Sequence, residues 1–197
     1  MFPTLPVSNN ETPAIRLAGR GDADAFARYL VEHLAESGRE GSAHFAPARS
    51  LSRDDIRVVA QSRWSRGLDE ALWGRGFLLW RGERVAGHLE LRGGRIPAEM
   101  HRATLGMGVL RRYTGQGHGR RLLEAAIAWA RDDAKLAWID LGVFASNARA
   151  RALYLRMGFV EQGRRPDAFR IDAGLAVEDV LMALDLAQRD PAEREGR

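Results

Sequence analysis

The segment VLRRYTGQGHGRR, residues 109–121, stands between an expected strand and an expected helix. Its glycines, Gly115, Gly117 and Gly119, occupy alternate positions, and glycine lets the backbone amides of a turn point inward. A helix that starts here adds unpaired N–H groups and the positive end of its dipole. Four basic side chains surround the turn: Arg111, Arg112, Arg120 and Arg121. The segment predicts a cradle for a pyrophosphate, with a glycine-rich turn and a solvated basic face as the alternative.

Two nucleotide-binding patterns compete for this cradle, and neither fits well. A phosphate-binding loop of the GK[ST] type needs a lysine, and the only lysine of the chain, Lys135, lies elsewhere. The dinucleotide fingerprint needs GxGxxG, whereas this segment has GxGxG. Asp140 follows at about the expected distance for a ribose-binding acid, but the strand predicted over residues 138–144 continues past it.

A second segment, ASNARARALYLRMGF at residues 145–159, follows that strand. Together the two segments resemble motifs A and B of the GCN5-related N-acetyltransferase (GNAT) superfamily, whose members bind acetyl-CoA. The first is similar to the family's [QR]xxGxG[AG] loop, with Thr114 where arginine or glutamine is usual, and the second to its SNxxAxxxYxxxGF signature. Threonine still supplies a backbone amide, so the departure at Thr114 leaves the cradle intact. The resemblance covers roughly residues 104–159.

The resemblance implies a site for acetyl-CoA as co-substrate, with no metal. In that family the pyrophosphate is held by backbone amides, which here belong to Gln116, Gly117, His118, Gly119 and Arg120, next to Thr114 and Gly115. The pantetheine pairs like an added strand with Val109, Leu110 and Arg111. The resemblance also brings Asn147 to the pantetheine arm, where it is at the same time a good N-cap for the following helix. Tyr154 then acts as the general acid that protonates the departing thiolate, with a half-buried core tyrosine as the alternative.

The chain has no cysteine, so direct attack of a neutral amine on the thioester is the simplest route. A backbone N–H near Val109 or Leu110 is expected to hold the oxyanion. Many family members place a glutamate early in the strand before the cradle, but residues 102–104 offer no acid. Glu90 is the best substitute by pattern, because it shares a strand face with His88 and is expected across from Ala103. A surface glutamate at this position, His101 as the base, and a base acting through ordered water remain alternatives.

Composition excludes several classes of function. The absence of cysteine removes disulfides and thiolate zinc sites, and the histidines show no HxxxH or HExxH spacing: His33, His44, His88, His101 and His118. The net charge is +4, but the 26 acidic residues are interspersed with the 30 basic ones, so no nucleic-acid patch is expected. Apolar stretches are short and the N-terminus lacks a leader pattern, so we expect a cytoplasmic protein that does not enter membranes.

The expected fold is a single GNAT domain over residues 13–187, of the α/β (α+β) class. It has a mixed, mostly antiparallel sheet of about six to seven strands and helices on both faces. Residues 1–12 are expected to form a flexible N-terminal lead-in, and residues 188–197 a flexible C-terminal tail. The expected strands are 15–18, 77–80, 85–91, 104–110, 138–144 and a final pair that begins at Phe159 and ends with 180–186. The expected helices run from Asp22 or Asp24 to about Ser37, with Phe26, Leu30, Val31 and Leu34 on one face, and over 52–66, 119–134 and 148–157.

The sequence says least about the acceptor, the molecule that receives the acetyl group. In this fold the first two helices and a loop at residues 163–174 are expected to flank its pocket, and both are mixed in charge. A small-molecule amine or amino acid is the first expectation, and a protein N-terminus or lysine the second. A CoA-binding module that catalyses no reaction remains an alternative function, and assembly into a homodimer remains an alternative to a monomer. Glycines inside the expected strands, Gly106, Gly108 and Gly142, indicate either close approach of another group or a bend in the sheet.

Overall fold

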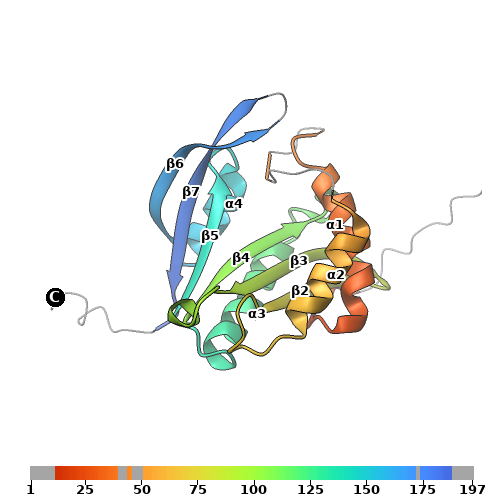
Figure 1. The fold of residues 1–197 in the computed structure, drawn as a ribbon. Coiled ribbons are helices and arrows are strands. Elements are labelled where there is room, and N and C mark those ends of the chain that lie inside the picture. The colour runs from red at the N-terminus through yellow and green to blue at the C-terminus, as the bar shows by residue number, and fades with distance from the viewer. Residues whose placement is uncertain (1–11, 40–43, 46–50, 172–173, 188–197) are drawn as a thin grey trace, which may run out of the picture.

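The computed structural model describes residues 12–39, 44–45, 51–171 and 174–187 (Figure 1). The strands are β1 Ala14–Leu17, β2 Gly74–Arg81, β3 Arg84–Gly93, β4 Arg102–Val109, β5 Trp138–Phe144, β6 Val160–Ile171 and β7 Leu175–Asp185. The helices are α1 Ala23–Ala35, α2 Arg53–Trp64, α3 His118–Asp132 and α4 Ala148–Arg156, with short 3₁₀ turns at Arg20–Asp22, Pro97–Glu99 and Arg111–Tyr113. The expected tail, and all of the expected lead-in except Thr12, lie outside the described residues.

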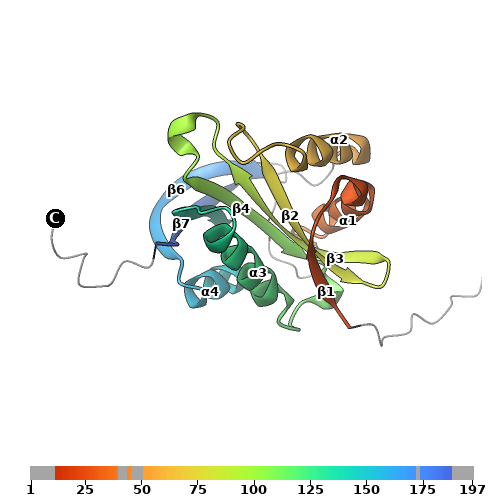
Figure 2. The same cartoon turned by 90° about the horizontal axis from the view of Figure 1, so that it is seen from below.

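The strands form one seven-stranded sheet in the order β1-β2-β3-β4-β5-β7-β6. Neighbouring strands are antiparallel except for β4 and β5, which are parallel. Helices α1 and α2 cover one face of the sheet, and α3 and α4 lie against the other (Figure 2). The mixed, mostly antiparallel sheet with helices on both faces is therefore confirmed.

The parallel pairing of β4 and β5 is short. It joins Arg102 to Trp138, Ala103 to Ile139 and Thr104 to Asp140, and the two strands then separate (Figure 1). Strand β4 stays paired with β3 as far as Val109, and β5 stays paired with β7 as far as Phe144. The central sheet therefore opens into a wedge between β4 and β5, and we call this opening the wedge.

The core on the α3 face contains Leu122, Leu123, Ala126 and Ala130, all fully buried, whereas Ile127 on the same helix is only partly buried. The prediction of which side chains of α1 are buried is wrong in part. Phe26 is buried, but Val31 is exposed, and Tyr29 and His33 are buried instead. Sequence patterning misses this face because polar aromatic side chains can be buried wherever a partner accepts their hydrogen bonds.

The expected loop at residues 163–174 is also wrong. Strand β6 runs through most of it to Ile171, and β7 begins at Leu175, earlier than expected. Strand β6 lies at the edge of the sheet with most of its side chains exposed, so it lacks the apolar alternation by which a strand is recognised. Main-chain pairing with β7 holds it, interrupted by register shifts between Glu161 and Gly163 and between Arg165 and Phe169.

We predict that Gly93→Ala destabilises the fold by about 1–3 kcal/mol, because a Cβ at Gly93 lies 2.1 Å from Nε1 of Trp73, whose side chain is fully buried. Gly163→Ala is the matched control, since nothing lies within 4 Å of its added Cβ. Urea unfolding of both variants measures the difference. Equal midpoints would contradict the packing described for Trp73.

Candidate active site

The glycine-rich turn forms an open helix start. Gly115 and Gly117 have positive φ angles of 82° and 78°, and Gly117 is the N-cap residue of α3, which begins one residue earlier than expected. The first helical bond of this turn runs from Arg121 N to Gly117 O, at 3.2 Å. No described side chain caps the helix, and no described atom lies within 4 Å of a Cβ placed on Gly117. The first amides of α3 therefore face open space, as an anion site requires.

The side chains around the turn have structural roles of their own. Thr114 Oγ1 donates to the carbonyl of Arg111 at 2.9 Å, so its side chain closes the preceding turn. His118 Nε2 lies 3.2 Å from Gln116 Oε1, and burial, with Arg121 and Arg81 nearby, lowers the pKa of the imidazole. Gly119 packs closely against α4, because an added Cβ would lie 3.1 Å from Leu153 Cδ2 and the leucine would have to shift slightly to accommodate it.

Helix α4 begins at Ala148 as expected and ends at Arg156, one residue before the expected end. Asn147 Oδ1 accepts a hydrogen bond from Ala150 N at 3.2 Å, which confirms its N-cap role, and Gly158 ends the helix with a φ of 90°. Tyr154 is 7% exposed and its ring centroid lies 5.6 Å from that of Phe159. Burial raises the pKa of the Tyr154 hydroxyl, so the group stays protonated at neutral pH.

The backbone of β4 presents a free edge to the wedge. Leu110 N donates to Ala86 O at 3.0 Å, on the β3 side. Because main-chain groups alternate in direction along a strand, those of Met107 and Val109 face the opposite side, where no described strand pairs with β4 beyond Thr104. Arg111 N donates to Glu36 Oε2 of the segment after α1 at 3.0 Å. The amides of Leu110 and Arg111 are thus bonded within the protein. Of the residues expected along the pantetheine, only Val109 keeps a free main-chain edge, and Met107, which was not expected there, shares that edge.

A buried aromatic cluster holds the diverging half of β4 from the α1 side. Tyr29 Oη donates to Gly108 O at 2.8 Å and lies 2.9 Å from His88 Nδ1. His33 stacks on Tyr29, with centroids 5.6 Å apart, and on Phe45 at 4.5 Å. Its Nε2 would lie 2.0 Å from a Cβ on Gly108, so close approach of a side chain explains that glycine. Burial lowers the pKa of His88 to about 3 and that of His33 to about 4, so both are neutral at pH 7.

Glu90 does not pair with Ala103 as expected. It lies opposite Gly106, and Gly93 takes the position opposite Ala103, because the connection between β3 and β4 begins only after Gly93. The Glu90 side chain is 14% exposed, and its Oε1 accepts from Trp64 Nε1 at 3.3 Å. Burial raises the pKa of this carboxyl, with Arg92 and Arg63 opposing the effect. Its expected neighbour on the same face, His88, lies opposite Gly108.

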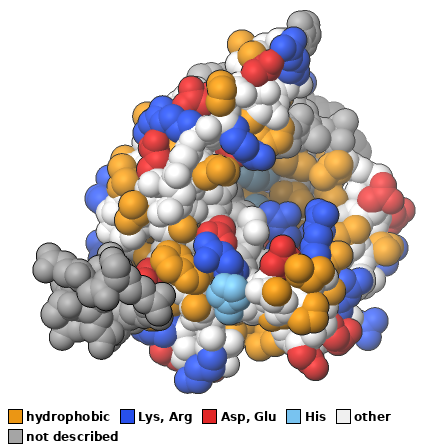
Figure 3. All heavy atoms as spheres, turned by 60° about the vertical axis from the view of Figure 1, so that its left-hand side comes forward, with side chains coloured by type: hydrophobic (Ala, Val, Ile, Leu, Met, Phe, Trp, Pro, Cys, Tyr) orange, Lys and Arg blue, Asp and Glu red, His pale blue; other side chains and the backbone are white. Residues whose placement is uncertain are grey.

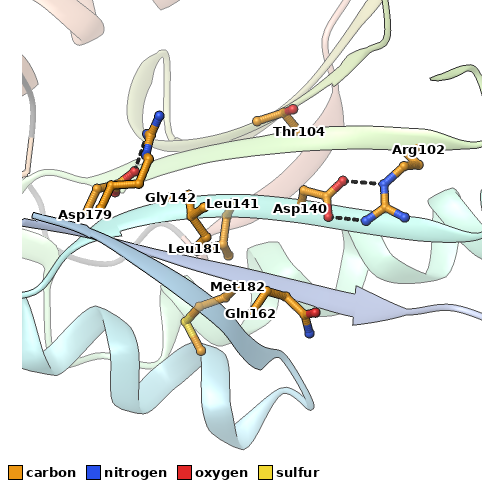
Figure 4. Close-up of a pocket in the computed structure, with 10 residues that line it drawn as sticks. Arg102, Thr104, Asp140, Leu141, Gly142, Gln162, Asp179, Leu181 and Met182 are labelled. Carbon is orange, nitrogen blue, oxygen red and sulfur yellow. Dashed lines mark hydrogen bonds and ion pairs between the residues drawn. The ribbon is translucent and has the colours of Figure 1, made fainter. Parts of the chain in front are cut away.

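A pocket of about 480 Å³ lies over β4, β5, β6 and β7 at the point where β4 and β5 separate. Figure 4 shows Asp140 and Asp179 at opposite ends of it. Arg102 binds Asp140 through two hydrogen bonds of 2.8 and 2.5 Å, and Arg165 binds Asp179 at 2.6 Å. A Cβ on Gly142 would lie 2.8 Å from Asp179 Oδ2, which explains the glycine. Sequence reasoning missed Asp179 and Arg165, and the glycine inside β5 was the only signal for them.

A second hollow of about 460 Å³ adjoins the first, and Thr104 lines both. Its charged lining comes from Arg63, Arg92, Arg95 and Glu99. Figure 3 shows acidic and basic side chains gathered around a depression near the centre of one face. His101, the other candidate base, is exposed and precedes β4, at the end where β4 and β5 are still paired.

Within the described parts of the chain, no group of three or more acidic, histidine or cysteine residues is placed to hold a metal ion. No helix among the described residues has the length and apolar character needed to cross a bilayer.

A family model described as "Acetyltransferase (GNAT) family" matches residues 30–159. The fold is similar to yncA from Salmonella typhimurium, solved with its cofactor acetyl-CoA (18% identity, 91% of this chain and 96% of that chain, TM-score 0.75). It is also similar to spermidine N-acetyltransferase from Vibrio cholerae in complex with CoA and spermine (20%, 89% and 96%, 0.67). A third similar structure is ribosomal-protein-alanine N-acetyltransferase from Brucella melitensis (21%, 87% and 99%, 0.72).

The neutral histidines predict a loss of stability in mild acid. In the unfolded chain, His33 and His88 take up protons below about pH 6.5, whereas in the folded protein they do so only near pH 4 and 3. The unfolded chain therefore binds more protons in this range, and the free energy of unfolding falls as the pH drops. Each histidine accounts for a loss of about 2 kcal/mol between pH 6.5 and 5.

Urea unfolding at pH 7.5 and pH 5 measures this loss, and NMR titration of the imidazole signals assigns it. Titration of His33 and His88 near pH 6.5 in the folded protein would show that the buried cluster is described wrongly.

Proposed function

The chain belongs to the GNAT acetyltransferase family, and we propose that it transfers an acetyl group from acetyl-CoA directly to a primary amine of a small molecule or amino acid. The observation that carries this proposal is the wedge itself. The separation of β4 and β5 after Thr104 and Asp140 leaves a free backbone edge at Met107 and Val109, which leads to the open start of α3. A thioester on an extended arm, ending in a pyrophosphate, has the shape that this arrangement accepts.

The cradle supplies the phosphate-binding half of the proposed site. The backbone amides of residues 116–120 grip the pyrophosphate, and the exposed side chain of Arg120 adds positive charge beside it. Val109 and Met107 pair with the pantetheine in the manner of an added strand. Asn147 lies at the start of α4, whose Leu153 packs against the Gly119 turn of α3, so its amide flanks the same arm.

Glu90 is the proposed general base. Its carboxylate lies on the α1–α2 face of β3, across from Gly106 in the diverging part of β4. Burial raises its pKa, which makes its carboxylate a stronger base than that of an exposed glutamate. Glu90 takes a proton from the ammonium form of the acceptor, directly or through water, and the free amine then attacks the acetyl carbonyl. The Val109 amide stabilises the negative charge on the carbonyl oxygen.

Tyr154 is the proposed acid for the leaving thiolate. Its hydroxyl is protonated at neutral pH because burial raises its pKa. A thiol has a pKa near ~8.5, so complete proton transfer from a tyrosine with a pKa of about 10 or more costs at least ~2 kcal/mol. The hydroxyl therefore acts first as a hydrogen-bond donor to the developing thiolate. Because Glu90 already holds the proton of the ammonium, the tetrahedral adduct loses its N–H proton to water as the C–S bond breaks. Tyr154 then protonates the thiolate and regains a proton from water.

No observation among the described residues favours the two alternatives, a protein N-terminus or lysine as acceptor and a CoA-binding module without turnover. Similarity of fold alone does not separate them, since similar structures include both a spermidine and a ribosomal-protein-alanine N-acetyltransferase.

We predict that saturating CoA raises the melting temperature of the protein and that Gly117→Glu abolishes this effect, because the new carboxylate occupies the phosphate seat. Gly174→Glu is the matched control: Gly174 also has a positive φ, of 101°, and open space around its Cβ position, but it lies in the β6–β7 turn. Thermal unfolding with and without CoA provides the measurement. Equal stabilisation of the two variants would remove the cradle from the proposed site.

We predict that Tyr154→Phe lowers kcat by about 10²-fold, with little change in CoA affinity, because the ring packing stays and only the proton donor is lost. Steady-state release of CoA thiol with a reactive amine gives kcat, and calorimetric titration gives the affinity. A phenylalanine variant with full turnover shows that Tyr154 is a core residue and that another group serves the thiolate.

A further inference from the structure

We propose that the acceptor carries a carboxylate, as a free amino acid does, and that Arg92 together with Arg63 binds it at the mouth of the wedge. This inference rests on the proposed N-acetyl transfer and specifies its acceptor. The arginines belong to two elements that meet at this point, β3 and α2.

The position of Arg92 places its charge beside the reacting region. Arg92 pairs across the sheet with Thr104, the last residue of β4 that is joined to β5. Its Nη2 lies 3.5 Å from the position of a Cβ on Gly106, so the guanidinium extends over the first part of β4 that has left β5. The absence of a side chain at Gly106 leaves that space open.

Arg92 is incompletely paired. Its Nε is buried and has no hydrogen-bond partner among the described residues. The carboxylate nearest to it, Glu90 Oε2, lies 3.9 Å away, and the same oxygen is 3.7 Å from Arg63 Nη1. Both separations exceed hydrogen-bond length, while Glu90 Oε1 is engaged by Trp64. Two guanidinium groups thus share one carboxylate, and one positive charge is left for a ligand.

The neighbouring acids do not supply a cation site. In the adjoining pocket, Asp140 is bound by Arg102 and Asp179 by Arg165, one guanidinium to each carboxylate. Glu99, in the second hollow, accepts from the backbone N–H of Arg95 at 2.8 Å. With Glu90 included, the described charged residues around the two hollows are five arginines and four acids. A polyamine in these hollows finds no carboxylate without a bonding partner among these residues, whereas an anionic ligand can bind the incompletely paired Arg92.

A guanidinium is suited to this ligand because it binds a carboxylate through two parallel hydrogen bonds. An amino acid carries its carboxylate and its amine on one carbon atom. Anchoring the carboxylate at Arg92 therefore holds the amine over Gly106, on the strand face from which Glu90 projects. A protein N-terminus or a lysine side chain has no carboxylate at this distance from its amine.

The test compares acceptors that differ only in the carboxylate. The full chain with saturating acetyl-CoA is assayed for thiol release with a panel of amino acids, the amide of each one, and spermidine. We expect kcat/KM to be at least about tenfold higher for the best amino acid than for its amide. Amidation lowers the pKa of the neighbouring amine and so increases the free base, which means that amine reactivity alone gives the opposite preference.

Arg92→Gln is expected to raise KM for the amino acid about tenfold or more and to abolish the preference over the amide. Arg63→Gln is expected to act in the same direction. Arg84→Gln, an exposed arginine at the other end of β3, is the matched control and keeps the preference. Melting temperatures confirm that each variant is folded.

Several results would overturn the inference: equal use of acid and amide, a preference for spermidine, an unchanged preference in folded Arg92→Gln, or stabilisation by acetyl-CoA without turnover of any panel member. Acetylation of spermidine alone leaves the proposed function standing while it removes the carboxylate site. If acetyl-CoA neither stabilises the protein nor is turned over, the proposed function fails and the inference fails with it.

Discussion

The parallel contact between β4 and β5 extends over only three residue pairs, and the proposed chemistry depends on this limit. Each strand is paired along its length with an antiparallel neighbour, β4 with β3 and β5 with β7. Parallel pairing is slightly weaker per residue than antiparallel pairing, so the sheet opens along this seam as its two halves twist apart. The opening exposes main-chain groups of Met107 and Val109 inside a folded domain, where unpaired backbone groups are costly unless a ligand or water binds them.

The α1 side of the molecule fixes the shape of the opening. Tyr29 donates to Gly108 O, and Glu36 accepts from Arg111 N, so two side chains from α1 and its C-terminal end hold β4 and the turn after it. His33 and His88 fill the space between α1 and the sheet as neutral rings, because burial disfavours their charged forms. The elements that flank the proposed acceptor site are therefore attached to the strand that borders the proposed acetyl-CoA site, and a change in one affects the position of the other.

Sequence patterns predicted correctly those elements whose structure is set by residues close together in the chain. Strand β5 has the predicted bounds, α4 starts at Ala148 as its N-cap predicts, and Gly115 and Gly117 adopt the positive φ angles that favour glycine. The missed features depend on contacts distant in sequence. Edge strand β6 is held by backbone pairing and lacks an apolar pattern, the register of Glu90 depends on where the β3–β4 connection begins, and Asp179 meets Gly142 only across the β5–β7 pair. The roles assigned to Tyr154, Asn147 and Glu90 remain proposals.

Amide hydrogen exchange with and without CoA tests the central claim most directly, namely that the wedge receives the pantetheine as an added strand and that the start of α3 receives the pyrophosphate. We predict that exchange of the Met107, Val109, His118 and Gly119 amides slows at least about tenfold when CoA binds, because each gains a hydrogen bond or is shielded from solvent. The amide of Gly163, in edge strand β6 two strands beyond β5 in the sheet order, keeps its rate. Protection confined to β6 and β7, or no protection of the β4 and α3 amides at saturating CoA, would contradict it.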